Sequence, residues 1–287
     1  MKMNCIDTHI HVWNFNRAQY AWLEGNTSIL NRSYLLSELE EEREKTNVSF
    51  GVLVQAANTV IETGYMLEVA EETEWMKGVV GWLPLMDPSK VDDLLMNGYG
   101  KHPLFKGVRH LIHDEPEPGW LLQPEVMESL HLLAKNNIPY DVVGILPEHL
   151  QTVLQLADKV PGLQLVLDHL NQPPINTNER FGKWGELITE LAHHPQVHAK
   201  ISGLGTTTGK GRNWNKEDIL PYVQFVLEHL GISRCFCGGD WPVSLLAGSY
   251  SHAWKVYEEV LTTLLDDKDT ADVLYYNAIN FYKLDLE

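Results

Sequence analysis

The stretch CIDTHIHVW, residues 5–13, is the first short apolar run of the chain and sets a pattern that recurs along it. Side chains two residues apart on a β-strand share a face, so His9 and His11 lie together, opposite the apolar side chains of the run. Two imidazoles on one face are suited to hold a metal ion or to meet a reacting oxygen. The alternative is a polar strand end with two solvated histidines, and the pair alone does not decide between them.

Seven more runs of this kind follow, most of them succeeded by a segment with helical spacing of its apolar residues. The predicted strands are 5–10, 50–56, 78–85, 107–112, 138–143, 163–169, 197–203 and 235–240. The predicted helices are 34–46, 62–75, 124–136, 148–159, 179–193, 217–230, 251–266 and 269–282. Alternation of strands and helices indicates a parallel sheet with right-handed crossovers. Eight repeats favour an α/β fold of the closed (β/α)8 barrel type over an open sheet, with the last two helices beneath the barrel.

Length and composition agree with one large domain over residues 1–287, since such barrels commonly use ~250 residues. No apolar stretch reaches the ~18 residues that span a bilayer, and the sequence MKMNC at the start lacks a signal core, so we expect a cytoplasmic protein without membrane contact. The chain has only three cysteines, with Cys5 far in sequence from Cys235 and Cys237, and this fits a reducing compartment. The formal net charge of −17 disfavours binding to nucleic acid or to anionic membranes.

Polar side chains gather at the carboxyl ends of the predicted strands, which is where barrels of this type carry their active sites. In chain order they are His9, His11, Gln55, Arg109, His113, Asp141, His169 and Asp240, followed at once by Trp241. Taken singly, each has a structural explanation, such as a helix cap for Asp240 or a satisfied core position for His169. Three of these histidines and Asp240 come from three strands whose carboxyl ends meet at one mouth of the barrel. Their convergence predicts a reaction site there.

Five segments carry a resemblance to a known family. They are DTHIH (7–11), FKGVRHLIHDEPEPGWL (105–121), LVLDHLNQPPI (165–175), KISGL (200–204) and GGDWPV (238–243). In this order they resemble the amidohydrolase superfamily, and within it the branch of sugar-acid lactonases and 2-pyrone-4,6-dicarboxylate lactonases. The resemblance implies a distorted (β/α)8 barrel, hydrolysis of a cyclic ester, and site roles for His9, His11, His169 and Asp240.

The ligand pattern predicts at most one metal ion. Superfamily members with two metals place a carboxylated lysine or a glutamate at the end of the fourth strand and a histidine at the end of the fifth. Here Lys106 begins its strand, and the fifth strand offers Tyr140 and Asp141. The metal ligands expected for a single Zn²⁺ are His9, His11, Asp240 and His169. Because the branch includes members thought to work without metal, a metal-independent reaction stays open.

Opening a lactone requires a base for the attacking water, positive charge or donors for the carbonyl oxygen, and an acid for the ring oxygen. We predict Asp240 as the base and later the acid, with His9, His11 and His169 polarising the carbonyl directly or through zinc. The residues predicted to bind substrate are Arg109, His113, Asp141, Trp241 and Gln55. Lys200 is expected to face the barrel interior, with Asp7 as its structural partner.

A neutral lactone of the fucono-, rhamnono- or galactono- type is the predicted substrate. A pyrone dicarboxylate requires several inward-facing cations, and only Arg109 and Lys200 qualify. The competing hypotheses are a pyrone-dicarboxylate lactonase, a metal-dependent decarboxylase and a catalytically silent binding protein. The sequence leaves open the stereochemistry and the ring size of the substrate. It also leaves open the oligomeric state of the protein, for which a homo-oligomer is one option.

Overall fold

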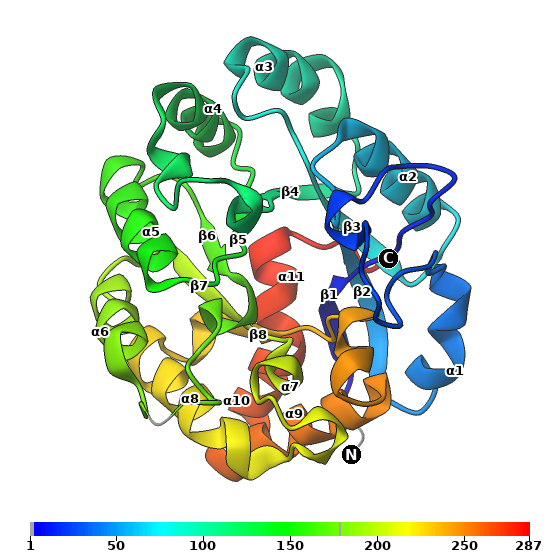
Figure 1. Cartoon of the computed structure of the whole chain (residues 1–287), viewed down its shortest axis with the longest axis vertical. Helices are drawn as coiled ribbons and strands as arrows, with labels where there is room; N and C mark the ends of the chain where they lie inside the picture. Colours follow the sequence, from blue (N-terminus) through cyan, green and yellow to red (C-terminus); the bar gives the residue numbers. More distant parts are fainter. Residues whose placement is uncertain (1–2, 178) are drawn as a thin grey trace.

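The computed structural model describes residues 3–177 and 179–287, and it shows eight parallel strands with helices around them (Figure 1). The strands are β1 (Cys5–Ile10), β2 (Val48–Val54), β3 (Met76–Gly81), β4 (Phe105–His110), β5 (Tyr140–Val142), β6 (Leu165–Leu167), β7 (Val197–Ile201) and β8 (Cys235–Cys237). Each strand pairs with the next in chain order. The His11 N–H donates to the Trp241 carbonyl over 2.7 Å, which joins β1 to the segment after β8. The (β/α)8 barrel prediction is confirmed.

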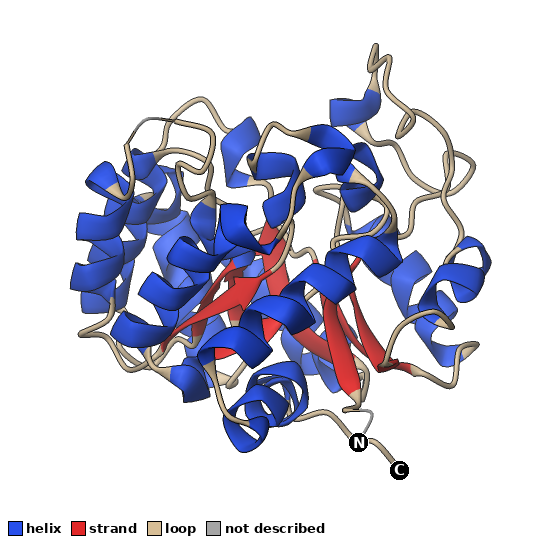
Figure 2. Cartoon of the chain, turned by 90° about the horizontal axis from the view of Figure 1, so that it is seen from below, coloured by secondary structure: helices blue, strands red, loops and turns tan. Residues whose placement is uncertain are grey.

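Most of the helices cover the outside of the strands (Figure 2). The helices are α1 (Glu40–Arg43), α2 (Val60–Glu71), α3 (Pro88–Asn97), α4 (Pro124–Lys135), α5 (Pro147–Lys159), α6 (Gly182–Leu191), α7 (Leu204–Thr207), α8 (Lys216–Leu230), α9 (Tyr250–Leu264), α10 (Asp267–Ala271) and α11 (Asn277–Tyr282). Of these, α7 lies at the mouth of the barrel and α11 below it. The helix predicted over 34–46 was too long, because only α1 and a 3₁₀ turn form there. Among the described residues no helix has the length and apolarity to cross a membrane.

Helix α3 was missed, although its start carries two local signals. The Asp87 carboxylate accepts a hydrogen bond from the Lys90 N–H, and Pro88 occupies the first turn, where its missing N–H costs nothing. The predicted helix over 269–282 exists as three consecutive pieces, α10, a π turn and α11.

The barrel interior divides into an apolar lower end and a charged upper end. The apolar cluster inside the strands is made of Ile6, Val52, Val54, Val80, Val166, Phe236, Ala278, Tyr282 and Leu284. Three of these residues come from α11 and the chain end after it, so α11 closes the barrel from below, as predicted. The helix predicted over 251–266 does not lie there, because α9 packs against α8 and α1 in the outer ring of helices (Figure 1). Burial of the lower end confines polar chemistry to the opposite mouth.

The charged upper end contains a buried lysine whose partner was wrongly predicted. Lys200 is fully buried and lies 2.6 Å from Asp141 Oδ2 and 3.2 Å from Asp168 Oδ1. Asp7 instead accepts hydrogen bonds from the Tyr250 hydroxyl (2.7 Å) and the Gly239 N–H (2.8 Å). Of the two aspartates that hold Lys200, Asp141 lies on β5 and Asp168 directly follows β6, whereas Asp7 lies on β1, on the other side of β8. Opposite charges at hydrogen-bond distance are what makes a buried lysine tolerable.

Candidate active site

The two histidines of β1 present their Nε2 atoms to the barrel mouth. His11 Nδ1 lies 2.8 Å from the Val54 carbonyl, which only accepts, so Nδ1 carries the proton and Nε2 keeps its lone pair. Burial lowers the pKa of His11, and it lowers the pKa of His9 well below the usual range. Both rings are therefore neutral at neutral pH, which is the form that binds metal ions.

Asp240 lies among three imidazoles at the carboxyl end of β8. Its Oδ1 atom is 3.4 Å from His11 Nε2, 3.8 Å from His9 Nε2 and 4.0 Å from His169 Nε2. The Asp240 backbone has a φ of +54°, in the left-handed region that non-glycine residues rarely adopt. Its N–H donates to the His9 carbonyl over 2.7 Å, which ties the strained residue to β1. Strain of this kind concentrates at functional sites.

A left-handed turn places the third histidine. Residues 169–172, directly after β6, all have φ values between +51° and +55°. Each such residue costs roughly 1–2 kcal/mol relative to ordinary backbone, so surrounding contacts must hold the turn. The Ser202 hydroxyl supplies one, 2.9 Å from His169 Nδ1, and the Trp184 indole N–H donates to the Leu170 carbonyl over 2.8 Å. The turn brings His169 and Gln172 to the same pocket.

Gly203, the second residue after β7, allows the close approach of two site residues. Its φ is +61°, and a Cβ atom there would lie 2.6 Å from His169 Nδ1 and 2.8 Å from Asp240 Oδ2. Distances this short are not tolerated, so any side chain would displace His169 or Asp240. The glycine-rich segment that follows β7 forms α7 and a 3₁₀ turn, and Thr206 on α7 lines the pocket.

Asp168 is a buried carboxylate to which the sequence analysis gave no role. It lies 3.1 Å from Arg109 Nη1, 3.2 Å from Lys200 Nζ and 3.4 Å from His9 Nδ1. Burial by itself would raise the pKa of Asp168, but Lys200, His9 and Arg109 outweigh it and hold that pKa well below its usual range. Lys200 Nζ also lies 3.4 Å from His9 Nδ1, but it is held more closely by Asp141 and Asp168. Arg109 Nη1 only donates and lies 3.3 Å from His9 Nε2, so Nε2 keeps a lone pair and the proton sits on Nδ1, on the side of the ionised Asp168.

A pocket of about 210 Å³ opens above this cluster. Its lining is His11, Trp22, Ala56, Arg109, Leu111, His113, Val143, Ile145, His169, Gln172, Thr206, Asp240 and Val243. Five predicted site residues therefore share it, and these are His11, Arg109, His113, His169 and Asp240. The fully buried His9 lies behind them, at the floor of the site.

Three residues predicted to bind substrate are not brought to this pocket. Gln55 is fully buried and accepts a hydrogen bond from Arg109 Nε over 3.0 Å, so it holds a lining residue in place. Asp141 is also fully buried, and its carboxylate is occupied by Lys200 and by the hydroxyl of Tyr282 (2.8 Å). Trp241 packs edge-on against Tyr34 and is 2% exposed.

Trp22 lines the pocket and was not predicted. It lies in the long connection between β1 and β2, and its indole N–H donates to the Ala56 carbonyl over 2.8 Å. The Glu62 carboxylate accepts from the N–H groups of Ala56 (2.9 Å) and Ala57 (2.7 Å), which fixes the same backbone from the other side. Burial raises the pKa of Glu62 to about 8, against the lowering effect of these N–H bonds. The connection has no periodic pattern, so only the residue type marks Trp22 in the sequence.

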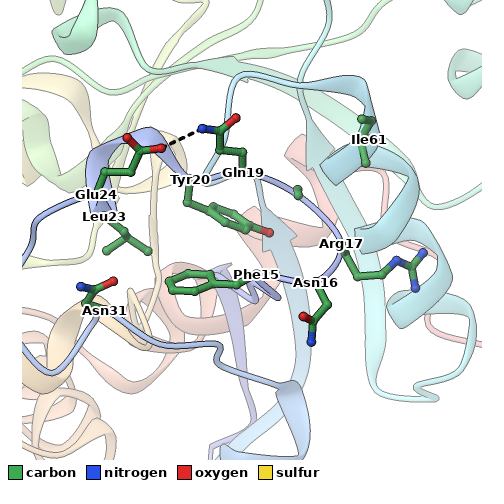
Figure 3. Close-up of a pocket in the computed structure, with 10 residues that line it drawn as sticks. Phe15, Asn16, Arg17, Gln19, Tyr20, Leu23, Glu24, Asn31 and Ile61 are labelled. Carbon is green, nitrogen blue, oxygen red and sulfur yellow. Dashed lines mark hydrogen bonds between the residues drawn. The ribbon is translucent and has the colours of Figure 1, made fainter.

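A second, larger pocket of about 420 Å³ lies along the 15–31 segment (Figure 3). Its lining is Phe15, Asn16, Arg17, Ala18, Gln19, Tyr20, Leu23, Glu24, Asn31 and Ile61. The Gln19 amide donates to Glu24 across part of it (2.7 Å), as Figure 3 shows. None of its lining residues is a histidine or an aspartate, so the smaller pocket at the barrel mouth is the candidate active site.

One part of the site fits a divalent cation. Ligand atoms of His9, His11 and Asp240 lie within 4.8 Å of one another, and a second such group joins His9 to Asp168 and His169. Two imidazole nitrogens and one carboxylate oxygen are a donor set that suits Zn²⁺. His169, the predicted fourth ligand to the same ion, belongs to the second group and has its Nε2 atom 4.0 Å from Asp240 Oδ1, so its role as a ligand stays a prediction.

The barrel and the His–Asp cluster at its mouth define a (β/α)8 protein with a site suited to hydrolysis. The family model described as Amidohydrolase matches residues 6–284, and the chain belongs to this family. The resemblance inferred from the sequence is thereby confirmed.

Named relatives extend over much or all of the chain. An L-fucono-1,5-lactonase of Burkholderia ambifaria is 31% identical over 98% of this chain and 96% of its own length. An L-rhamnono-gamma-lactonase of Scheffersomyces stipitis is 28% identical over 63% of this chain and 60% of its own length. A solved amidohydrolase of Burkholderia multivorans with bound zinc superposes with a TM-score of 0.88 at 26% identity, covering 98% of this chain and 100% of that one.

Proposed function

We propose that the protein hydrolyses the cyclic ester of a neutral sugar-acid lactone, with Asp240 as the general base. The observation that carries the proposal is the position of Asp240 Oδ1, within 4.0 Å of three imidazole Nε2 atoms at the floor of the pocket. The two lactonases named above support the reaction class.

The proton path uses one carboxylate twice. Asp240 takes a proton from water as the water oxygen bonds to the lactone carbonyl carbon. When the bond between that carbon and the ring oxygen breaks, the same carboxyl group returns the proton to the ring oxygen. The product is an open-chain hydroxy acid, which ionises and releases one proton to solvent at neutral pH.

The tautomers of the histidines favour a bound cation over direct hydrogen bonding to the carbonyl. His11 Nε2 carries a lone pair because Nδ1 donates to the Val54 carbonyl, and His9 Nε2 carries one because Arg109 Nη1, which only donates, lies 3.3 Å away. The neutral rings therefore accept at Nε2 and do not donate to an oxyanion. His9, His11 and Asp240 would hold the ion. When bound, Zn²⁺ supplies Lewis-acid polarisation of an oxygen at the site. Asp240 Oδ1 faces the imidazoles and Oδ2 lies on the side of Gly203, so one oxygen stays available for the proton.

The charge of the pocket favours a neutral substrate. Arg109 is the one arginine or lysine among the lining residues, and its guanidinium is already engaged by Gln55 and Asp168. Two carboxylates of a pyrone dicarboxylate would require further cations, since buried anions need paired positive charge.

A substrate panel tests the proposal. We expect kcat/KM for at least one neutral aldonolactone to exceed that for 2-pyrone-4,6-dicarboxylate by tenfold or more. A pH-indicator assay measures ring opening of the aldonolactones, and loss of the pyrone absorbance follows the dicarboxylate, each corrected for spontaneous hydrolysis. Preference for the dicarboxylate would overturn the substrate assignment. Failure to open any lactone would overturn the function.

Gly203→Ala is expected to lower kcat by roughly tenfold to a hundredfold, because its Cβ displaces His169 and Asp240 and small misplacements of reacting groups are costly. Gly211→Ala is the matched control, since Gly211 also has a positive φ (+53°) but nothing lies within 4 Å of a Cβ there. Steady-state kinetics and thermal unfolding of both variants separate the two effects. Equal kinetics in the two variants would show that the close approach at Gly203 does not position the site.

A further inference from the structure

The lone pair of His9 Nε2, which the proposed metal site would use, already faces a donor of the protein itself. Arg109 Nη1 lies 3.3 Å from His9 Nε2, and both residues are buried. A guanidinium only donates hydrogen bonds, and an unprotonated imidazole nitrogen has one lone pair. That lone pair can accept from an N–H group or bind a metal ion, so the contact with Arg109 and a bound ion compete for the same atom.

Buried hydrogen bonds hold the Arg109 guanidinium beside His9. Arg109 Nε donates to the Gln55 side-chain oxygen over 3.0 Å, and Nη2 donates to the Gln55 backbone carbonyl. Nη1 lies 3.1 Å from Asp168 Oδ2. Gln55 is itself fully buried, and its side-chain amide donates to the Ala57 carbonyl over 3.1 Å. The guanidinium therefore cannot withdraw from His9 without breaking buried hydrogen bonds, each of which is costly to lose.

The charge of Arg109 also acts on the proposed metal site. Arg109 is 3% exposed, so water screens its charge poorly, and a guanidinium is not deprotonated in proteins. The network around it consists of two cations and two carboxylates, which are Arg109, Lys200, Asp141 and Asp168. Their charges cancel, so the network as a whole does not attract a cation. Without Arg109 it would carry one net negative charge beside His9, which favours a cation there.

We infer that Arg109 weakens zinc binding by His9, His11 and Asp240, because it occupies the His9 Nε2 lone pair and cancels the negative charge beside it. The site of the unaltered protein is then filled only when zinc is plentiful, and in the metal-free protein Arg109 is the cation that His9 Nε2 contacts. The inference rests on the ligand set given with the proposed function. Zinc binding is measured without substrate, so the lactonase proposal can fail while the inference stands.

The test measures the zinc affinity of the metal-stripped full chain by competition with a chromogenic chelator. We expect the zinc dissociation constant of Arg109→Met to be roughly ten- to a hundredfold lower than that of the unaltered protein, the range over which neighbours of metal ligands change metal affinity. The direction of the change is decisive, since a substitution that merely loosens the site weakens zinc binding. Arg109→Gln also removes the charge and is expected to change the affinity in the same direction. Thermal unfolding shows that each variant is folded.

Arg17→Met is the matched control, because Arg17 also pairs with a carboxylate, that of Glu68, but has a side chain that is 43% exposed and lies along the larger pocket. It removes the same charge and should change the zinc affinity by less than about twofold, since exposed distant charges are screened. Adding His9→Ala to Arg109→Met should abolish the gain in affinity. Zinc affinity that is unchanged or weaker in the Arg109 variants overturns the inference, and so does an equal gain in Arg17→Met or a gain that persists without His9.

Discussion

Replacing Asp240 by asparagine is expected to lower kcat by about 10²–10⁴-fold, the usual contribution of a general base, with little change in KM. The amide has nearly the shape of the carboxylate and can keep the contacts of the site, but it cannot accept the proton of the attacking water. Because the backbone of Asp240 is left-handed and asparagine tolerates this conformation, the variant should also fold normally. Single-turnover and steady-state rates on the best lactone of the panel measure the effect.

Asp114→Asn is the matched control for this experiment. Asp114 lies after β4 with a side chain that is 44% exposed, and it belongs to the barrel mouth but not to the lining of the active-site pocket. Its variant should keep kcat within a factor of about two to three, as expected for a surface carboxylate without a partner in the reaction. A loss in kcat of less than tenfold for Asp240→Asn would exclude Asp240 as the base.

The barrel could be predicted because its strands are buried on both faces and interrupt the helical pattern at regular intervals. Short runs of β-branched and apolar residues mark such strands even when only three residues pair, as in β5, β6 and β8. The boundaries of the strands were predicted less accurately than their number and order. The run over 163–169 predicts one strand, but β6 ends at Leu167 because the backbone turns left-handed at His169. His169 and Asn171 are residue types enriched at positive φ, but Leu170 and Gln172 are not, so the sequence signals the turn only weakly.

Site residues could be predicted where strand order alone brings them together. His9 lies near the carboxyl end of β1, and His11, His169 and Asp240 follow strand ends, so any closed barrel places them at one mouth. The partner of Lys200 could not be predicted this way. Inside a barrel a long side chain can lean toward either neighbouring strand, and the choice of Asp141 and Asp168 over Asp7 depends on the stagger of the strands.

The role of Asp168 depends on contacts that its position after a strand does not reveal. The sequence places it beside His169, yet its carboxylate points to the barrel interior, where it meets Lys200 and Arg109 and orients His9. Its charge favours a proton on His9 Nδ1, and Arg109 approaches His9 Nε2 at 3.3 Å, so Asp168 and Arg109 together favour a lone pair on Nε2. The metal-binding and proton-accepting parts of the site therefore depend on a buried charge network that no strand-end pattern reveals.

A protein with both His9→Ala and His11→Ala is expected to lose roughly 10³-fold in kcat/KM, since removal of a single group that stabilises the transition state already costs about 10²–10³-fold. It should also bind no divalent ion, because Asp240 would be left as the only member of its ligand group. Elemental analysis of the purified protein provides the second readout. In the unaltered protein we expect zero or one zinc per chain, with a partial loss of activity on chelation.

The control is His193→Ala with His194→Ala, a second histidine pair that lies in the turn after α6, outside the barrel mouth. This variant should keep its activity and its metal content. Two metal ions per chain in the unaltered protein would refute the ligand count, since His9 and Asp240 cannot serve two complete sites. Full turnover by the His9 and His11 double variant would show that the pair with which the sequence begins is only a polar strand end. The position of Asp240 argues against that outcome. Its Oδ1 atom lies 3.4 Å from His11 Nε2 and 3.8 Å from His9 Nε2, so acceptor atoms of neutral rings and of a carboxylate face one another, and a cation or a reacting group would stabilise this arrangement.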